Sequence, residues 1–229
     1  DIDRNVGRIL DRLEELGIGD NTIVMFTSDN GPEDMEITNA AHSAAGSPGP
    51  FRGRKRSLYD GGIRMPFLCR WPAKIPAGTV DSQSVLGAVD MMPTLCEAAA
   101  VPLPEDHQLE GESVMDALTG DTHRREKALI WEFACHPMFG HVINKSPTLA
   151  IRRDRYKLLL NPERDRVELY DLTAEQTELA NIADDHPDLV TELSAEVMAW
   201  KERCPQNVRD LKAGSDYYRW PGEKLWGIL

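Results

Sequence analysis

The first part of the chain changes from a helical pattern to a strand pattern. Apolar residues recur at steps of three and four from Ile2 to Leu16, which predicts a helix that Gly17 can terminate. Residues 22–27 are then apolar at consecutive positions, and such a run predicts a strand covered on both faces, as in a parallel sheet flanked by helices. Helix, loop and strand make half of a βαβ unit, so we expect the preceding strand to lie outside this chain.

The middle of the chain predicts shorter elements. Residues 31–50 carry glycine, proline, serine, asparagine and alanine without periodicity, which predicts a loop at the carboxyl side of the sheet. A second short strand is predicted at 65–71, and Asp90 can cap a helix over 91–100. A shorter helix is predicted near 113–118.

Strands follow one another directly in the last part of the chain. Four segments joined mostly by tight turns predict an antiparallel meander; they are residues 128–133, 148–153, 156–160 and 166–170. A helix that begins at Pro187 has one apolar stripe, suited to cover one face of the meander. We therefore predict an α/β protein of three parts: the end of a large α/β domain at 1–122, a small antiparallel β subdomain with a covering helix at 123–204, and a tail at 205–229.

Composition narrows the class of protein. The 229 residues are 41% hydrophobic, which is enough for a substantial core. A net charge of -12 argues against a nucleic-acid partner, and no apolar run approaches the roughly 20 residues that cross a membrane. Four widely spaced cysteines without a Cys-x-x-Cys pair indicate neither a zinc cluster nor a dense disulfide framework. The first residues do not form a signal peptide, so we expect any targeting segment to have been removed or to lie upstream.

Two oxygen-bearing side chains follow the first predicted strand. Asp29 and Asn30 lie at its carboxyl end, where open α/β sheets bind ligands. A carboxylate and an amide carbonyl are hard donors, suited to Ca²⁺ or Mg²⁺. The alternative is an ordinary Asp-Asn-Gly turn, in which both side chains bind local backbone groups.

A cationic loop follows about twenty residues later. Arg52, Arg54 and Lys55 stand beside Gly53, and glycine lets the backbone approach an anion while lysine supplies a compact charge. This arrangement suits a phosphate or sulfate ester, and the alternative is a solvated basic turn. Arg64 could extend the cationic site or pair with an acid such as Asp60.

Two histidines lie in a later loop that could overhang the end of the sheet. His136 and His141 fall within residues 135–145, which leave the first strand of the predicted meander. They are candidates for substrate contact, and exposed or structural histidines are the alternative.

These motifs together resemble the sulfatase family, which belongs to the alkaline-phosphatase-like superfamily. The resemblance rests on five segments in the family's order and spacing: residues 23–32, 49–66, 71–78, 90–95 and the pair 149–158 with 168–172. The resemblance implies an alkaline-phosphatase-like α/β sandwich domain with a small antiparallel subdomain. It also implies that Asp29 and Asn30 are the family's second pair of calcium ligands, and that Lys55 holds a sulfate oxygen.

The family's nucleophile is not found in this sequence. The resemblance implies a hydrated formylglycine made from Cys or Ser in a Cys/Ser-x-Pro-x-Arg motif, with calcium as the metal. Residues 135–139 begin as such a motif but end in Phe139 and lie in the wrong subdomain. We therefore expect this chain to be the C-terminal portion of a sulfatase, inactive alone and partnered by the N-terminal portion. By resemblance, the enzyme is expected to be periplasmic or secreted.

The spelling of residues 49–55 resembles bacterial carbohydrate sulfatases, including N-acetylgalactosamine-6-sulfatase-like enzymes. A sulfated glycan is therefore the expected substrate, contacted by Arg52, Arg54, His136 and His141. Two alternatives stay open: a phosphodiesterase or phosphonate hydrolase of the same superfamily, and a non-catalytic glycan-binding protein.

Overall fold

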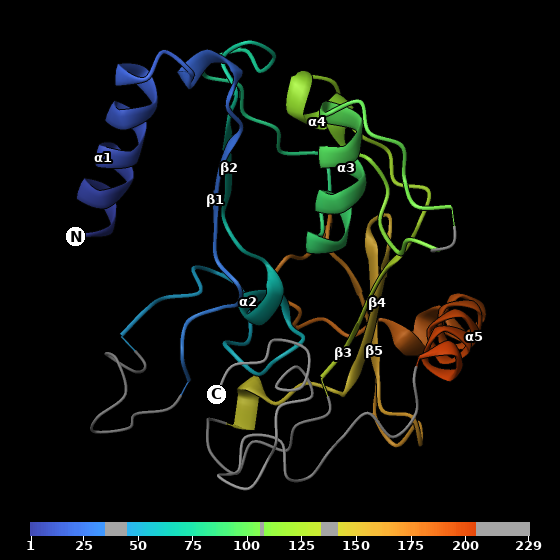
Figure 1. Ribbon diagram of the computed structural model, residues 1–229. Coiled ribbons are helices and arrows are strands. Elements are labelled where there is room, and N and C mark those ends of the chain that lie inside the picture. Colours follow the sequence, from blue (N-terminus) through green and yellow to red (C-terminus); the bar gives the residue numbers. More distant parts are fainter. Residues whose placement is uncertain (35–44, 106–107, 134–141, 205–229) are drawn as a thin grey trace, which may run out of the picture.

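A computed structural model describes residues 1–34, 45–105, 108–133 and 142–204 (Figure 1). Its helices are α1 (Ile2–Glu15), α2 (Asp60–Ile63), α3 (Met91–Ala98), α4 (Met115–Thr119) and α5 (Pro187–Arg203). Its strands are β1 (Val24–Thr27), β2 (Phe67–Arg70), β3 (Leu129–Glu132), β4 (Leu149–Arg153), β5 (Tyr156–Leu160) and β6 (Val167–Asp171). Short 3₁₀ turns lie at Gly19–Asn21, Ala88–Asp90, Val142–Asn144 and Ala183–Asp185. No described helix is both long and apolar enough to span a membrane.

The first sheet differs from the predicted one. Strand β1 pairs with β2 in an antiparallel register that runs from Val24 opposite Arg70 to Thr27 opposite Phe67. The prediction of a parallel strand covered on both faces is wrong for the described residues: Phe26 is 42% exposed and Leu68 is 58% exposed. A run of apolar residues indicates only that a strand can be buried. Whether the strand pairs in a parallel or an antiparallel direction depends on how the chain leads from it to the neighbouring strand.

Helix α1 lies beside this sheet without burying any of its own residues. Figure 1 shows α1 on one side of β1 and β2, and α3 with α4 on the other side. The link from α1 to the sheet is polar, because Arg70 Nη2 donates to Glu14 Oε1 at 2.6 Å. The apolar stripe of α1 stays open, with Ile2 69% and Ile9 57% exposed.

The second sheet is the predicted meander. Its strand order is β3-β4-β5-β6, and every neighbouring pair is antiparallel. The turn from β4 to β5 is tight because Asp154 adopts a left-handed backbone conformation (φ 50°), which aspartate tolerates better than most residues.

The two faces of this second sheet carry different chemistry, since side chains alternate along a strand. One face is apolar and packs against α5, as predicted: Leu158 and Leu160 of β5 share a cluster with Leu193 and Val197 of α5. The opposite face carries the alternate positions, Lys157 and Leu159 on β5 among them. It packs against the segment around α2, which Figure 1 shows between the two sheets.

Asp90 takes the predicted place but a different role. It stands at the N-cap position of α3, yet its side chain makes no cap hydrogen bond to that helix. Its carboxylate instead binds Arg125 in a bidentate pair, at 2.5 Å and 3.0 Å. It also accepts the backbone N–H groups of Gly87 at 2.6 Å and Glu112 at 3.1 Å. A single buried carboxylate therefore joins the start of α3 to the strand-rich part of the chain.

We expect the free energy of unfolding to fall as the pH rises through the pKa of folded His123. Nε2 of His123 lies 2.7 Å from Glu112 Oε1, and Nδ1 lies 2.9 Å from Asp116 Oδ1. Burial lowers the pKa of His123, but the hydrogen bonds to Asp116 and Glu112 outweigh burial and raise it. A group with a raised folded pKa stabilises the fold below its unfolded pKa of about 6.5, and this contribution is lost above the folded pKa.

Urea unfolding at about pH 6, below the unfolded pKa, and at an alkaline pH of about 9 measures the effect. Between the two pH values, the free energy of unfolding should decline less in the His123→Asn variant than in the wild type. A decline of equal size in both proteins would show that His123 does not cause it.

Candidate active site

The candidate metal ligands lie just beyond the end of β1. The turn that carries Asp29 and Asn30 is fixed by Gly31, whose backbone N–H donates to the carbonyl of Gly62 at 2.9 Å. A Cβ atom on Gly31 would lie 2.0 Å from the carbonyl oxygen of Gly61. Only glycine permits this approach, so the two backbone segments are closely joined here.

The basic segment, residues 52–62, runs past the same point. Lys55 donates its backbone N–H to the carbonyl of Pro32 at 2.9 Å. Since Pro32 is two residues from Asn30, the structure brings the candidate metal ligands and Lys55 to one corner. Figure 1 shows α2, the end of this segment, beside the carboxyl end of β1.

Replacing Gly31 by alanine should lower the free energy of unfolding by about 1–3 kcal/mol, the usual cost of adding a methyl group to a closely packed place. Gly7 is the matched control, because a Cβ atom there meets nothing within 4 Å. Gly7 lies within α1, so its change to alanine should stabilise by up to about 1 kcal/mol. Urea denaturation measures both, and two changes of the same sign would contradict the close approach at Gly31.

The oxygen atoms of Asp29 and Asn30 are hard donors, the type of ligand atom that calcium and magnesium ions prefer. Asp29 is exposed, and one carboxylate oxygen accepts the N–H of Asn30 at 3.0 Å. This local turn contact leaves other lone pairs for a cation, since a carboxylate has about four acceptor positions. Calcium takes 6–8 oxygen ligands. Within the described ranges no group of three or more His, Cys, Asp or Glu side chains could hold a metal ion, so Asp29 and Asn30 would need further ligands.

Lys55 is accessible and only loosely held. Its side chain is 41% exposed, and its Nζ lies 3.7 Å from Glu33 Oε2. Glu33 also pairs with Arg56. Sequence reasoning missed Glu33, although an acid three residues after Asn30 is a visible signal of a counter-charge for the basic segment.

Arg52 and Arg54 are held within the fold. Arg52 Nη1 donates to the carbonyl of Glu178 at 2.9 Å and to Tyr170 Oη at 3.2 Å, and its Nε donates to the carbonyl of Ile143 at 3.2 Å. Arg54 Nε donates to the carbonyl of Glu33 at 3.1 Å. These protein partners engage Nε and Nη1 of Arg52, and the substrate contact predicted for Arg52 and Arg54 stays a prediction. The basic segment is also more than a solvated turn.

The remaining predicted residues divide into two groups. Arg64 Nη1 lies 3.5 Å from Asp60 Oδ2. Of the two alternatives for Arg64, the structure therefore shows the ion pair with Asp60. His136 and His141 lie outside the described residues, so their predicted substrate contact stays a prediction.

A buried polar group that joins Tyr59 of the basic segment to Glu168 and Arg166 was not predicted. Tyr59 Oη donates to Glu168 Oε2 at 2.6 Å and accepts a hydrogen bond from Arg166 Nη2 at 2.7 Å. Burial, together with the hydrogen bond to Glu168, raises the pKa of Tyr59, so its hydroxyl remains a donor. Sequence periodicity could have indicated Glu168, which interrupts an apolar strand at a position that alternates with Val167 and Leu169.

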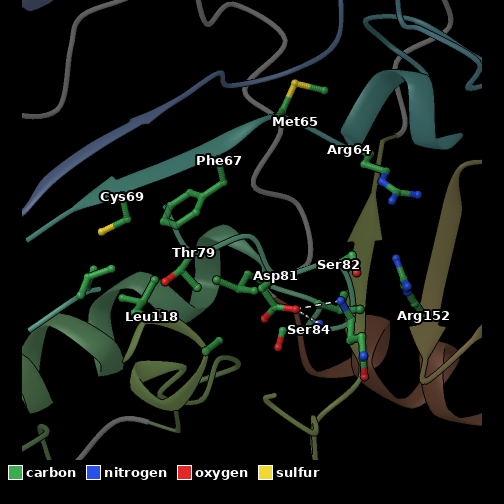
Figure 2. A pocket seen from close by; sticks show the side chains of 15 residues that line it. Arg64, Met65, Phe67, Cys69, Thr79, Asp81, Ser82, Ser84, Leu118 and Arg152 are labelled. Atoms are coloured by element: carbon green, nitrogen blue, oxygen red, sulfur yellow. Dashed lines mark hydrogen bonds between the residues drawn. The ribbon is translucent and has the colours of Figure 1, made fainter. Parts of the chain in front are cut away.

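A cavity of about 400 Å³ lies between β2 and α4, and Figure 2 shows its lining. Phe67 and Cys69 of β2 border it, with Arg64 and Arg152 on another wall. Asp81 Oδ1 accepts the backbone N–H groups of Gln83 and Ser84 there, drawn as dashed lines in Figure 2. Apart from Arg64, none of the predicted site residues that the structure describes lines this cavity, so it is separate from the corner that holds Asp29 and Lys55.

The family of the chain is decided by a match that covers most of it. Residues 51–203 match the family described as N-sulphoglucosamine sulphohydrolase, C-terminal. The chain belongs to the sulfatase family. The resemblance that the sequence motifs indicated is thereby confirmed, including its restriction to the C-terminal portion of the family.

Relatives of this sulfatase chain are longer than it is. An N-acetylgalactosamine-6-O-sulfatase of Bacteroides thetaiotaomicron is 30% identical over 220 residues, which cover 88% of this chain and 40% of that relative. A steryl-sulfatase of Mus musculus is 36% identical over 133 residues, which cover 58% of this chain and 21% of that relative. The sulfatase chain therefore spans about two-fifths of the length of the bacterial relative.

A solved structure confirms the fold of the sulfatase chain. The similar chain comes from work on the metabolism of multiple glycosaminoglycans by Bacteroides thetaiotaomicron. It superposes with a TM-score of 0.68 at 29% identity, over 88% of this chain and 43% of its own length. The predicted alkaline-phosphatase-like α/β class is confirmed, with β1 and β2 corrected as described above.

Proposed function

We propose that the protein containing this chain is a sulfuric ester hydrolase that acts on a sulfated carbohydrate. One observation supports the proposal: within a sulfatase-family fold, the backbone of Lys55, whose side chain is accessible, bonds to Pro32, two residues after Asn30 in the loop that carries the oxygen donors Asp29 and Asn30. Hard oxygen ligands and a cation are the groups that a sulfate ester needs for neutralisation of its charge.

Lys55 is proposed to bind a sulfate oxygen. Its contact with Glu33, at 3.7 Å, is longer than a hydrogen bond, so a sulfate oxygen can replace the carboxylate as its partner. Sulfate carries its charge on several oxygens and can bind Lys55 while it contacts a second group. The lysine would therefore hold the sulfate group and stabilise the negative charge that develops on it.

Asp29 and Asn30 are proposed to hold calcium, with magnesium less suited to a partial and exposed set of ligands. Bound calcium would act as a Lewis acid toward the sulfate oxygens. The formylglycine that the family resemblance implies is proposed to come from a part of the protein outside this chain. On this proposal, residues 1–229 alone do not hydrolyse sulfate esters.

A sulfated sugar is favoured over a steroid by the extent of the similarity. The relative named as an N-acetylgalactosamine-6-O-sulfatase aligns with 88% of this chain, whereas the steryl-sulfatase aligns with 58%. The contacts proposed for Arg52, Arg54, His136 and His141 would then lie with the sugar rather than with the sulfate group.

Turnover of a sulfate monoester and of a phosphate diester, compared in the presence of calcium, tests the proposed activity. We expect the sulfate monoester to be preferred. A preference for the diester would support a phosphodiesterase or phosphonate hydrolase instead. Tight glycan binding without turnover of either ester would support a non-catalytic glycan-binding protein.

Replacing Lys55 by alanine should lower kcat in the active protein by about 100- to 1,000-fold, the usual effect of removing one group that stabilises a developing oxyanion. Because the Lys55 side chain is partly exposed, the unfolding midpoint should stay close to that of the wild type. Steady-state kinetics and urea denaturation measure the two effects. Lys74→Ala, at an exposed position, is the control, and wild-type turnover by Lys55→Ala would contradict the role of Lys55.

A further inference from the structure

A buried lysine lies between two carboxylates on the side of the second sheet that faces away from α5. Lys157 Nζ lies 2.7 Å from Asp60 Oδ1 and 2.8 Å from Glu178 Oε1. The side chains of Lys157 and Glu178 are fully buried, and that of Asp60 is 4% exposed. Charges so far from water are retained only when they are paired, and loss of one partner is strongly unfavourable.

These three side chains take no part in the proposed chemistry, yet they meet at the basic segment. Asp60 is five residues from Lys55 and begins α2. Its side chain accepts a hydrogen bond from Lys157, while its backbone N–H donates to Glu178 Oε2 at 2.6 Å. Strand β5 therefore holds the side chain of Asp60 through Lys157, and the loop that follows β6 holds its backbone through Glu178.

The other end of the basic segment is held by β6 and by the loop that follows it. Arg52 donates to the backbone carbonyl of Glu178 at 2.9 Å. Its guanidinium group also lies 3.8 Å from the ring centre of Tyr59, whose hydroxyl binds Glu168 of β6. Gly61 closes the segment by donating its N–H to the carbonyl of Arg52 at 2.7 Å.

Lys55 stands between these two attachments. Its backbone is joined to the loop that carries Asp29 through Pro32, but its side chain is only loosely held by Glu33. The place of its ammonium group therefore depends on the backbone of the basic segment.

We propose that Lys157 and Glu178 are positioning residues, which fix the basic segment against the second sheet and so place the Lys55 ammonium group for sulfate. The proposal rests on the sulfate-binding role of Lys55 given above. Neither residue touches the substrate, because both are buried between the sheet and the basic segment.

The charges give a more specific arrangement than an apolar contact would. Leu58, Tyr59 and Leu159 already form an apolar cluster at the same interface, which fills space and joins the two parts. An ion pair adds direction, since the hydrogens of Nζ must meet particular oxygens. Burial raises the pKa of Glu178, whereas Lys157 and neighbouring arginines outweigh burial and lower the pKa of Asp60, so Asp60 is the firmly charged partner.

Hydrogen exchange of backbone amides tests the attachment without reference to activity. In the protein that contains this chain, Lys157→Met and Glu178→Gln should each speed exchange in peptides that cover residues 52–64. Peptides from α5 should keep the wild-type rate, because α5 packs on the other face of the sheet. Lys74→Met is the matched control, since it removes an exposed lysine and should change neither region. Glu178→Gln keeps the size of the side chain and gives the result if Lys157→Met does not fold.

A double-mutant cycle tests the positioning role. Lys157→Met should lower kcat/KM for a sulfate monoester by about 100-fold, as a misplacement of about 1 Å can do. When Lys157→Met is added to Lys55→Ala, kcat/KM should fall by less than about threefold below that of Lys55→Ala alone, because the effects of residues that act as a unit are not additive. Glu178→Gln should show the same pattern with a smaller first effect.

Two results would overturn the proposal. Losses of activity that multiply fully in the double variant would show that Lys157 acts independently of Lys55. Faster exchange that extends equally to α5 would show a general structural role. If Lys55→Ala itself keeps wild-type activity, the proposed function of Lys55 fails, and the exchange data separately show whether the attachment exists.

Discussion

Replacing Asp29 by alanine should lower kcat/KM for a sulfate ester by about 1,000-fold in the active protein. A metal ion supplies several kcal/mol of charge stabilisation, and each 1.4 kcal/mol is a factor of ten in rate. Asp29 supplies the negative charge of the proposed ligand pair, whereas Asn30 supplies a neutral oxygen. Loss of the carboxylate should therefore remove most of the affinity of this corner for calcium.

Calorimetric titration with calcium measures this loss independently of turnover, and the dissociation constant should rise at least about tenfold. Asp29→Asn keeps an oxygen donor without the charge, so its affinity should lie between those of wild type and Asp29→Ala. Asp11→Ala, which removes an exposed carboxylate from α1, is the control. Unchanged calcium affinity in Asp29→Ala would exclude Asp29 as a ligand.

Replacing Asp90 by alanine should lower the free energy of unfolding by about 3–5 kcal/mol, the usual cost of removing one member of a buried ion pair. The Asp90 side chain is fully buried, and that of Arg125 is 8% exposed. The change would leave the guanidinium of Arg125 without its counter-charge, although Arg125 keeps its bonds to the carbonyls of Val85 and Lys127. It would also leave the N–H groups of Gly87 and Glu112 without their acceptor.

Urea denaturation followed by circular dichroism measures this loss. Asp90→Asn keeps an acceptor of the same shape, so it should cost less than Asp90→Ala. Asp121→Ala removes an exposed carboxylate and should stay within about 0.5 kcal/mol of wild type. If Asp90→Ala and Asp121→Ala had equal effects, the buried pair would not stabilise the fold.

The helices and strands were predictable where the apolar residues of a segment followed one clear periodicity. The meander of β3 to β6 and the apolar stripe of α5 follow from alternation and from three- and four-residue spacing, so both are as expected. The partner of β1 was not predictable in the same way. Its apolar run indicates burial, but the antiparallel pairing with β2 depends on a return of the chain about forty residues later.

The candidate site was predictable only in its local parts. Asp29, Asn30 and Lys55 stand in short motifs whose chemistry is visible in the sequence, and the structure brings them to one corner. Arg52 stands in the same motif but is engaged by Glu178, which is 126 residues away. No local pattern shows that an arginine of this motif is held by a backbone carbonyl so far along the chain.

The buried ion pairs could not be predicted because their members are far apart in the sequence. Lys157 and its partner Asp60 are 97 residues apart, and Asp60 and Glu178 are 118 residues apart. A lysine inside the apolar strand of residues 156–160 was the available signal. It indicates a buried partner, but only the folded chain shows which acid that partner is.

The two faces of the second sheet should also differ in how well they tolerate substitutions. Substitutions at Leu158 or Leu160, which face α5, are expected to change stability gradually, because apolar cores accept other side chains of similar volume. Substitutions at Lys157, one position away on β5, or at Glu168 on β6 change contacts that converge on the basic segment. Neighbouring codons of one strand would therefore diverge at different rates, with α5-facing positions drifting among aliphatic residues while the opposite positions stay restricted.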